Sequence, residues 1–126
     1  MKIKVAELIN RPLNWVVATC EGYTNLRKNP HRFANDLLIT SSKDGKNIKL
    51  SDFSPSTGWS HGGKIIERER IQISPQSWCW HATRVHTDQK MVVSHYGPTP
   101  LIAAMRCFVA SKLGDEVDVP DELLGD

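Results

Sequence analysis

Apolar and polar positions recur with a helical period near the beginning of the chain. Apolar side chains fall on one stripe between Leu13 and Cys20, and Gly22 follows as a residue suited to the position after a helix. The pattern predicts a helix over residues 12–21. Trp15 lies one step from this stripe, so we expect it in the core or at its edge.

The strongest helical pattern lies near the end of the chain. Between residues 100 and 113, apolar side chains recur at spacings of three and four residues and define one buried face. Thr99 can accept a backbone hydrogen bond as the N-cap, Pro100 suits the first helical position, and Gly114 suits the far end. The sequence therefore predicts a helix over residues 100–113.

Two segments have the alternating pattern of antiparallel hairpins. The first covers residues 37–50 and contains Asp44-Gly45, a pair that is typical of tight hairpin turns. The second joins an alternating segment at residues 78–85 to another at residues 91–96. Both hairpins are expected to contribute strands to an antiparallel sheet.

The segments between these elements are expected to be less regular. Residues 2–5 alternate like a short strand, whereas residues 23–36 have neither period and contain a proline, which predicts a loop. Residues 64–70 are expected to make a single helical turn that leads into a strand over residues 71–74. Together these elements predict an α+β fold, in which an antiparallel sheet of two hairpins plus short strands is packed by two helices on one face.

Length and composition are those of one folded domain. The chain has 126 residues, of which 40% are hydrophobic and 24% charged, values that exclude a largely disordered chain. We expect one domain over residues 1–126 with an acidic tail from about residue 114. The three cysteines lack the spacing of a disulfide framework or a zinc knuckle, and no apolar run approaches a signal-peptide core or a membrane span of ~18 residues. A cytoplasmic protein that does not enter membranes is expected.

The charges are distributed unevenly along the chain. The formal net charge is +2, but the residues after Gly114 include six acids and no Lys or Arg. Residues 1–113 therefore hold eight acids against 16 bases, a net charge of +8. This asymmetry favours an anionic partner, or an acidic tail that folds back over a basic face. A solvated tail beside an ordinary basic surface is the alternative.

The segment around Trp59 is the first candidate site. Residues 54–63 read SPSTGWSHGG, and the proline and glycines predict a tight surface path that leaves the indole exposed. An exposed indole can stack on a planar ring, with Ser56 and Thr57 as hydrogen-bonding neighbours. The alternative is that Trp59 folds over the open end of the sheet and belongs to the core.

The predicted helix start at Thr99 is the second candidate site. Its unpaired backbone amides and the positive end of its dipole favour an anion, although Pro100 removes one donor. We expect Thr99, Arg106 and Arg68 to hold this anion. With the Trp59 segment, they predict a non-enzymatic protein that binds a small nucleotide-like or anionic ligand and needs no cofactor or metal. Plain helix capping without a ligand is the alternative.

Acidic and histidine residues allow an enzymatic alternative. Glu67 or Glu69, with His81 or His95, could act as acid and base in the cleavage of a nucleotide phosphodiester. This chemistry requires groups from separate elements to converge, which a sequence does not show. Cys79, His81 and His95 could share a strand face, but their spacing matches no established metal site, and we expect no metal there.

Basic residues support a third interpretation, the binding of a nucleic acid or a host protein. Arg27, Lys28 and Arg32 lie in the expected loop, and further lysines lie in the first hairpin. Their charge would make nucleic-acid binding strongly dependent on salt. No helix with a basic face is evident, so nucleic acid is less favoured than a small ligand or a host protein. Assembly into a homo-oligomer stays open.

Three blocks of the sequence together resemble a known family. They are LNWVVATCEG near the start, SPSTGWSHGGKIIERERI in the middle and GPTPLIAAMRCFVASKLGDEVDVPDELL at the end. In their order and spacing they resemble the NinX-like family of small phage proteins. The resemblance implies a bacteriophage accessory protein made in the cytoplasm of the host bacterium. In that setting, a protein that binds nucleotides could sequester a host defence signal.

Overall fold

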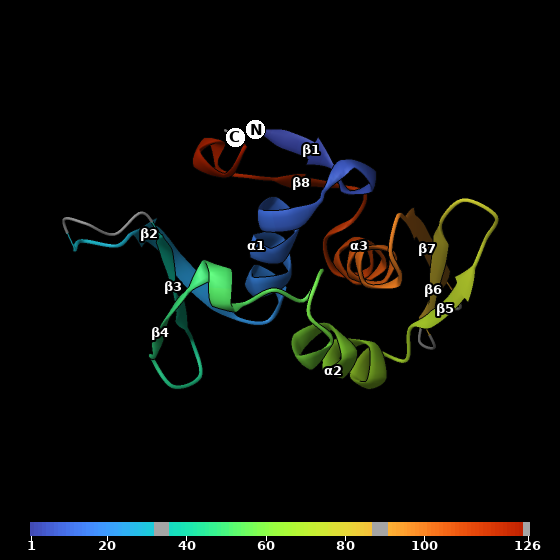
Figure 1. Ribbon diagram of the computed structural model, residues 1–126, viewed down its shortest axis with the longest axis horizontal. Coiled ribbons are helices and arrows are strands. Elements are labelled where there is room, and N and C mark those ends of the chain that lie inside the picture. The colour runs from blue at the N-terminus through green and yellow to red at the C-terminus, as the bar shows by residue number, and fades with distance from the viewer. Residues whose placement is uncertain (32–35, 87–90, 125–126) are drawn as a thin grey trace.

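The computed structural model describes residues 1–31, 36–86 and 91–124 and has the predicted α+β fold (Figure 1). The described residues form three α-helices: α1 (Asn10–Cys20), α2 (Trp59–Glu69) and α3 (Pro100–Leu113). They also form three small antiparallel sheets, which are β1 (Lys2–Lys4) with β8 (Glu116–Asp118), then β2 (Tyr23–Lys28), β3 (Leu37–Ser41) and β4 (Asn47–Lys49), and then β5 (Gln72–Pro75), β6 (Trp80–His86) and β7 (Met91–Gly97). Short 3₁₀ helices are η1 (Val5–Glu7), η2 (Leu50–Asp52) and η3 (Asp121–Leu123).

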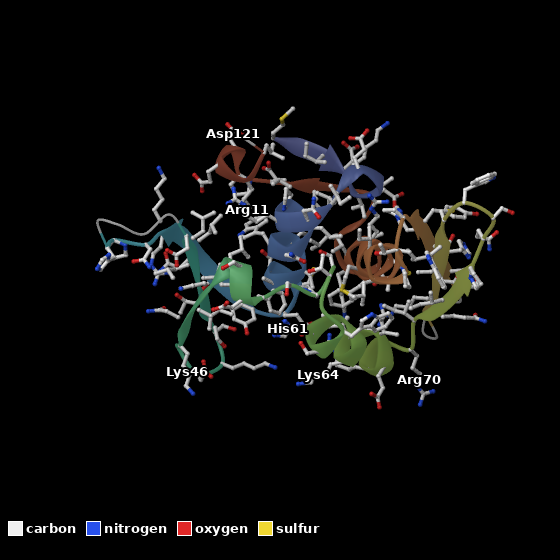
Figure 2. All side chains as sticks on the ribbon, viewed as in Figure 1. Arg11, Lys46, His61, Lys64, Arg70 and Asp121 are labelled. Carbon is white, nitrogen blue, oxygen red and sulfur yellow. The ribbon has the colours of Figure 1, made fainter. Side chains whose placement is uncertain are left out.

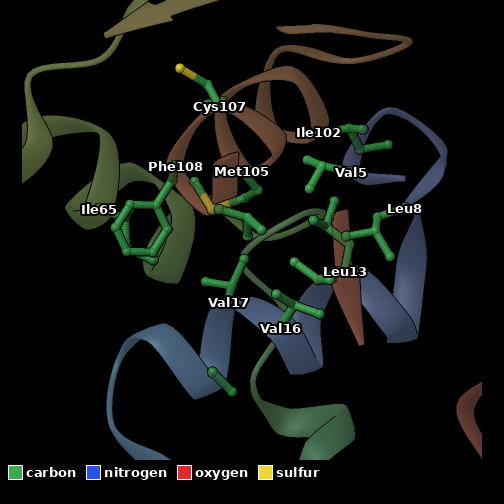
Figure 3. Close-up of a cluster of buried hydrophobic side chains, with 14 of the residues drawn as sticks. Val5, Leu8, Leu13, Val16, Val17, Ile65, Ile102, Met105, Cys107 and Phe108 are labelled. Carbon is green, nitrogen blue, oxygen red and sulfur yellow. The ribbon is translucent and has the colours of Figure 1, made fainter. Parts of the chain in front are cut away.

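Helix α3 lies at the centre of the core. It packs against α1, α2 and the β5–β6–β7 sheet, and every residue from Leu101 to Ala110 is buried except Arg106. Figure 3 shows Phe108 of α3 beside Ile65 of α2. The sequence predicted one buried face for this helix. More of its surface is covered because two helices and a sheet meet around it.

Both predicted hairpins are confirmed, but they do not share a sheet. β3 pairs with β4 across a turn in which Gly45 has a φ of +71°, a conformation that glycine adopts without strain. β6 pairs with β7 in the second hairpin. The two hairpins lie at opposite ends of the molecule, with the helices between them (Figure 1). The intervening helices keep their strands apart, so the single sheet expected from the sequence does not form.

Residues 23–28 form strand β2, where the sequence predicted a loop. β2 pairs with β3, and the register shifts within it. Asn25 has a φ of +60° in this irregular stretch, and such a bulge interrupts the alternation by which strands are found in a sequence. Arg27 hydrogen-bonds a threonine hydroxyl of β3 at 3.1 Å, and Lys28 is exposed. Arg32 lies outside the described residues.

Helix α2 replaces the predicted glycine-rich loop and single helical turn. It contains two glycines and has no side-chain cap at its start, and both features weaken the helical pattern in the sequence. Arg70 ends the helix in a left-handed conformation, and β5 follows near the predicted place. The helix buries Gly62 and Ile65, and it packs against α3. Tertiary packing therefore outweighs a low helix propensity.

The acidic tail folds back onto the N-terminal strand. β8 pairs with β1, which places Lys2 opposite Asp118 and Lys4 opposite Glu116. The two chain ends consequently lie side by side (Figure 1), and Arg11 and Asp121 lie at this end of the molecule (Figure 2). Three apolar side chains of the tail are buried, namely Val117, Val119 and Leu123. The tail is therefore packed against the rest of the chain through a few apolar side chains.

Candidate functional site

A cavity of about 280 Å³ lies between the starts of α2 and α3. It is bordered by the segment before α2 and by the first turns of both helices. Its lining residues are Ser56, Thr57, Trp59, Thr99, Pro100, Leu101 and Ile102. The structure therefore brings together four of the six residues that the sequence predicted to bind a ligand. We call this space the α2–α3 cavity.

The two helices approach closely because α2 has a glycine where they meet. A Cβ atom at Gly62 would lie 2.3 Å from the Pro55 carbonyl oxygen and 2.6 Å from Leu101 Cδ2. Both distances are far below van der Waals contact, so no side chain fits there. At Gly63, by contrast, a Cβ atom would lie 3.6 Å from Trp59 Cε3, which is an ordinary contact. Gly62 therefore sets the spacing of the cavity walls.

Hydrogen bonds fix the segment that precedes α2. The Ser54 carbonyl accepts two backbone hydrogen bonds within the turn, at 3.2 and 2.7 Å. The Ser54 N–H donates to His61 Nδ1 at 3.4 Å, and Figure 2 shows His61 on α2. The Ser56 N–H donates to Asn14 Oδ1 of α1 at 3.0 Å. This wall of the cavity is thus tied to two helices and is formed before any ligand arrives.

The Ser56 hydroxyl is a buried polar group with an unmet hydrogen bond. Ser56 is 1% exposed, and its Oγ has no hydrogen-bond partner in the described part of the chain. Leaving a buried hydroxyl unpaired costs about 1–3 kcal/mol. Ser56 also lines the α2–α3 cavity, so the unmet hydrogen bond lies in the wall of this cavity.

Two helix starts border the same cavity. At α3, Thr99 Oγ1 accepts a backbone N–H one turn on at 3.1 Å, which confirms the predicted cap, and Pro100 has no N–H. At α2, the cap residue is Gly58, and the N–H groups of Trp59 and Ser60 have no acceptor among the described residues. The positive ends of two helix dipoles therefore favour an anion here.

Trp59 is 57% exposed and borders the cavity. The prediction that its indole is exposed is confirmed, and the alternative that it fills the core is wrong. Its ring lies beside Gly63, one turn further along α2, where no side chain hinders it. The remaining surface of the indole is free to stack on a planar ring.

The comparison with known families agrees with the resemblance seen in the sequence. Residues 4–112 match the family model described as bacteriophage P22 NinX. The chain belongs to this phage NinX family. The matched region includes every residue that lines the α2–α3 cavity, whereas β8 lies beyond it. No curated protein matches the chain. In the described residues, no helix is long and apolar enough to span a membrane.

The two arginines predicted to hold an anion lie elsewhere in this NinX-family chain. Arg68, near the end of α2, pairs with both carboxylate oxygens of Glu21 and with Glu69, and these bonds raise the pKa of its guanidinium. Arg106 of α3 donates to two backbone carbonyls, at 2.8 and 2.9 Å, and borders a different cavity. Neither arginine lines the α2–α3 cavity.

The two histidines predicted as acid/base groups lie on opposite faces of a sheet. His81 pairs across the strands with Tyr96, and their ring centroids are 4.7 Å apart. His95 is one position away in the register, so its side chain points to the other face, with Nε2 3.5 Å from Asp115 Oδ1. The register separates His95 from His81, and no cluster of three metal-ligating side chains forms within the described residues.

The two glutamates of α2 have different surroundings. Glu67 is exposed, whereas the Glu69 side chain is 10% exposed, and its carboxylate lies 2.7 Å from Arg84, 2.8 Å from Arg68 and 3.6 Å from Lys112. The Arg84 contact is an ion pair without hydrogen-bond geometry. Burial alone would raise the pKa of Glu69, but the Arg68 hydrogen bond and the other two cations outweigh it and hold the pKa below its ordinary value. Glu69 therefore links α2 to β6 and α3 as an ionised group.

Sequence reasoning missed the apolar wall of the α2–α3 cavity. Pro100, Leu101 and Ile102 line it, although the sequence assigned them only to the start and buried face of a helix. The feature that points to this wall is Gly62, because a glycine inside a helix often marks a close approach of another segment. Gly62 can be interpreted in this way only after α2 has been recognised as a helix.

Proposed function

We propose that this phage NinX-family protein binds a small anionic ligand with a planar, nucleotide-like ring in the α2–α3 cavity. The observation that carries the proposal is the buried, unpaired hydroxyl of Ser56 in a cavity between two helix starts. A native cavity with an unmet hydrogen bond and an exposed indole at its border has the composition of a ligand site.

The ring of the ligand is assigned to Trp59. Stacking on an indole contributes about 1–3 kcal/mol per base and requires an accessible face, which the 57% exposure of Trp59 supplies. Leu101 and Ile102 provide an apolar surface for the same ring. The volume of about 280 Å³ is at the small end of ligand pockets, so one base with its phosphate is the largest unit that we expect it to enclose.

The anion is assigned to neutral donors. Arg68 and Arg106 do not line the cavity, and no Lys or Arg is among the described residues that line it. The N–H groups at the start of α2 and the hydroxyls of Thr57 and Thr99 are the available donors. We expect this arrangement to bind phosphate with less dependence on salt than a cluster of lysines, because the donors are fixed dipoles.

Binding without chemical turnover is the favoured activity. The predicted acid/base residues do not line the cavity, and the part of its lining that the structure describes contains no His, Cys, Asp or Glu. A phosphodiesterase needs such groups, or a metal, close to the reacting atoms. In the infected host, we infer that the protein sequesters a nucleotide-derived defence signal rather than destroying it.

The test compares Trp59→Ala with the wild type in thermal unfolding, with and without a panel of linear and cyclic nucleotides. A ligand at 100 times its Kd should raise the Tm of the wild type by about 10 °C, and Trp59→Ala should lose this shift. The variant alone should melt no more than about 5 °C lower, because most of the indole is exposed. Trp78→Ala, which removes an exposed indole outside the cavity, is the matched control.

Two results would contradict the proposal. One is an unchanged ligand shift in Trp59→Ala, which would place the ligand elsewhere. The other is the recovery of cleaved nucleotide at many turnovers per protein after heat release, which would favour the hydrolase alternative. Glu67→Gln and His81→Gln would then be the next variants to examine.

A further inference from the structure

A second cavity, of about 400 Å³, lies next to the tip of the β5–β6 hairpin. Its lining includes Trp78, His95, Tyr96 and Arg106, and it shares no residue with the α2–α3 cavity. We call it the hairpin cavity. It combines a cation with the exposed ring of Trp78, and these are residue types that dominate recognition sites.

Arg106 brings an unneutralised charge to the hairpin cavity. Its Nε donates to the Leu8 carbonyl at 2.8 Å and its Nη1 to the Tyr96 carbonyl at 2.9 Å, and no carboxylate of the described residues lies within 4 Å to form an ion pair. A guanidinium has five N–H donors, so three are left over, one on Nη1 and two on Nη2. Neighbouring donors on these two nitrogens fit both oxygens of one carboxylate.

Partial burial of this guanidinium has a desolvation cost. Partial burial lowers the pKa of Arg106, which means that its charged form has lost part of its hydration. The two backbone carbonyls restore some of that loss as acceptors, but they carry no full negative charge. A bound anion would offset the remainder, which is why a half-buried arginine without a carboxylate partner favours anion binding.

Trp78 supplies an exposed ring to the hairpin cavity, whereas the ring of Tyr96 lies on the sheet face opposite the His95 side chain. The Gln76 N–H donates to the Cys79 carbonyl at 2.8 Å, so Trp78 lies in the two-residue tip of the hairpin, where it is 96% exposed. Tyr96 is 57% exposed, and its ring is held against the ring of His81. A large ring exposed beside a cavity is typical of a surface that a partner covers.

We propose that the hairpin cavity binds an aromatic carboxylate, with the carboxylate on Arg106 and the ring stacked on Trp78. A carboxylate is favoured over a phosphomonoester because Arg106 supplies one positive charge, whereas a phosphomonoester carries close to two negative charges at neutral pH. His95, which also lines the cavity, already faces Asp115. A free aromatic acid and the C-terminal aromatic residue of a peptide share this chemistry.

The test is an NMR titration of the full chain with three probes: N-acetyltryptophan, N-acetyltryptophanamide and acetate. N-acetyltryptophan should bind at least tenfold more tightly than the amide, which has the ring without the charge, and than acetate, which has the charge without the ring. Trp78→Ser should weaken N-acetyltryptophan binding about tenfold to a hundredfold. It should leave the Tm unchanged, because the indole is almost fully exposed.

Further variants separate this site from the α2–α3 cavity. Arg106→Lys keeps the charge but lacks the planar fork, so it should lose the preference for N-acetyltryptophan over its amide. Trp59→Ser should leave that preference intact, which keeps the result independent of the proposed function. Equal affinity for the acid and the amide, or an unchanged Kd in Trp78→Ser, would overturn the proposal. The proposal would also be overturned if AMP bound more tightly than N-acetyltryptophan and if Trp78→Ser weakened this binding of AMP.

The source of the carboxylate is settled by one more probe. A hexapeptide that ends in tryptophan should bind tenfold more tightly than N-acetyltryptophan if the partner is a protein C-terminus, because the peptide backbone adds contacts along β7. Equal affinities would assign the site to a free aromatic acid. Both outcomes support an aromatic carboxylate, and failure of the peptide and the free acid together to bind would refute it.

Discussion

The neighbouring glycines of α2 provide a sharp test of the packing between α2 and α3. Both are helical positions, so replacing either by alanine should favour the helix by about 0.5–1 kcal/mol. Only Gly62 faces the crossing, where a Cβ atom would lie 2.3 Å from the Pro55 carbonyl oxygen and 2.6 Å from Leu101 Cδ2. At Gly63 the nearest atom, Trp59 Cε3, would be 3.6 Å away. The two substitutions should therefore have opposite effects.

The magnitudes follow from these distances. For Gly62→Ala, the helices must separate by about 1 Å to restore contact, and such overpacking costs about 1–3 kcal/mol or more, which exceeds the helical gain. We expect a net destabilisation of about 1–2 kcal/mol. For Gly63→Ala the helical gain stands alone, and we expect a stabilisation of about 0.5–1 kcal/mol. In a chain of this length, 1 kcal/mol corresponds to about 4 °C in Tm.

Urea unfolding of the two variants and the wild type would measure these differences. The midpoints should move in opposite directions with equal m-values, since neither substitution changes the surface exposed on unfolding. Gly62→Ala should also weaken ligand binding in the α2–α3 cavity, because it moves the cavity walls apart. A neutral or stabilising Gly62→Ala would contradict the close contact of Gly62 with Pro55 and Leu101.

Three further predictions concern stability. Glu69→Gln should cost about 2 kcal/mol of stability at pH 7, because it removes a carboxylate from among three cations. Folding lowers the pKa of Glu69 from 4.5, so this stabilisation is complete above pH 4.5 and disappears as the pH falls through the pKa of the folded state. Acid titration of the wild type and the variant should therefore show that their stabilities converge at low pH. Thr99→Ala should cost about 1 kcal/mol and Thr99→Ser much less, as measured by urea unfolding, because serine keeps the cap. A chain that ends at residue 114 loses β8 and three buried side chains, so its free energy of unfolding should fall by on the order of 5 kcal/mol and its Tm should fall with it. An unchanged Tm would show that the tail is not part of the core.

Short-range sequence patterns were sufficient to predict the elements that depend only on neighbouring residues. The cap at Thr99 and the turn at Gly45 are confirmed because each depends on a few neighbouring residues. Strand β2 and helix α2 were missed because irregularities interrupt their sequence patterns. Strand β2 contains a bulge near Asn25 that breaks its alternation, and α2 contains glycines that lower its helical propensity.

The candidate site was partly accessible from the sequence. The exposure of Trp59 and its nearness to Thr99 were anticipated from a glycine-rich segment and a helix start. The positions of Arg68 and Arg106 were not, because their partners are far away in the sequence. Arg68 pairs with Glu21, and Arg106 binds the carbonyl of Leu8. Long side chains follow whichever carboxylate or carbonyl the fold brings within reach.

The sequence by itself determined the α+β class, the two hairpins, the capped helix α3 and membership of the phage NinX family. The fold class, the hairpins and the helix depend on periodicity and on turn and cap residues, which act over a few positions, whereas family membership rests on the order and spacing of the matching sequence blocks. The tertiary structure alone decided that the hairpins lie in separate sheets, that Gly62 serves close packing, and that Ser56 is buried with its hydroxyl unpaired. These properties arise between segments distant in sequence, because burial and contact depend on which surfaces meet when the chain folds.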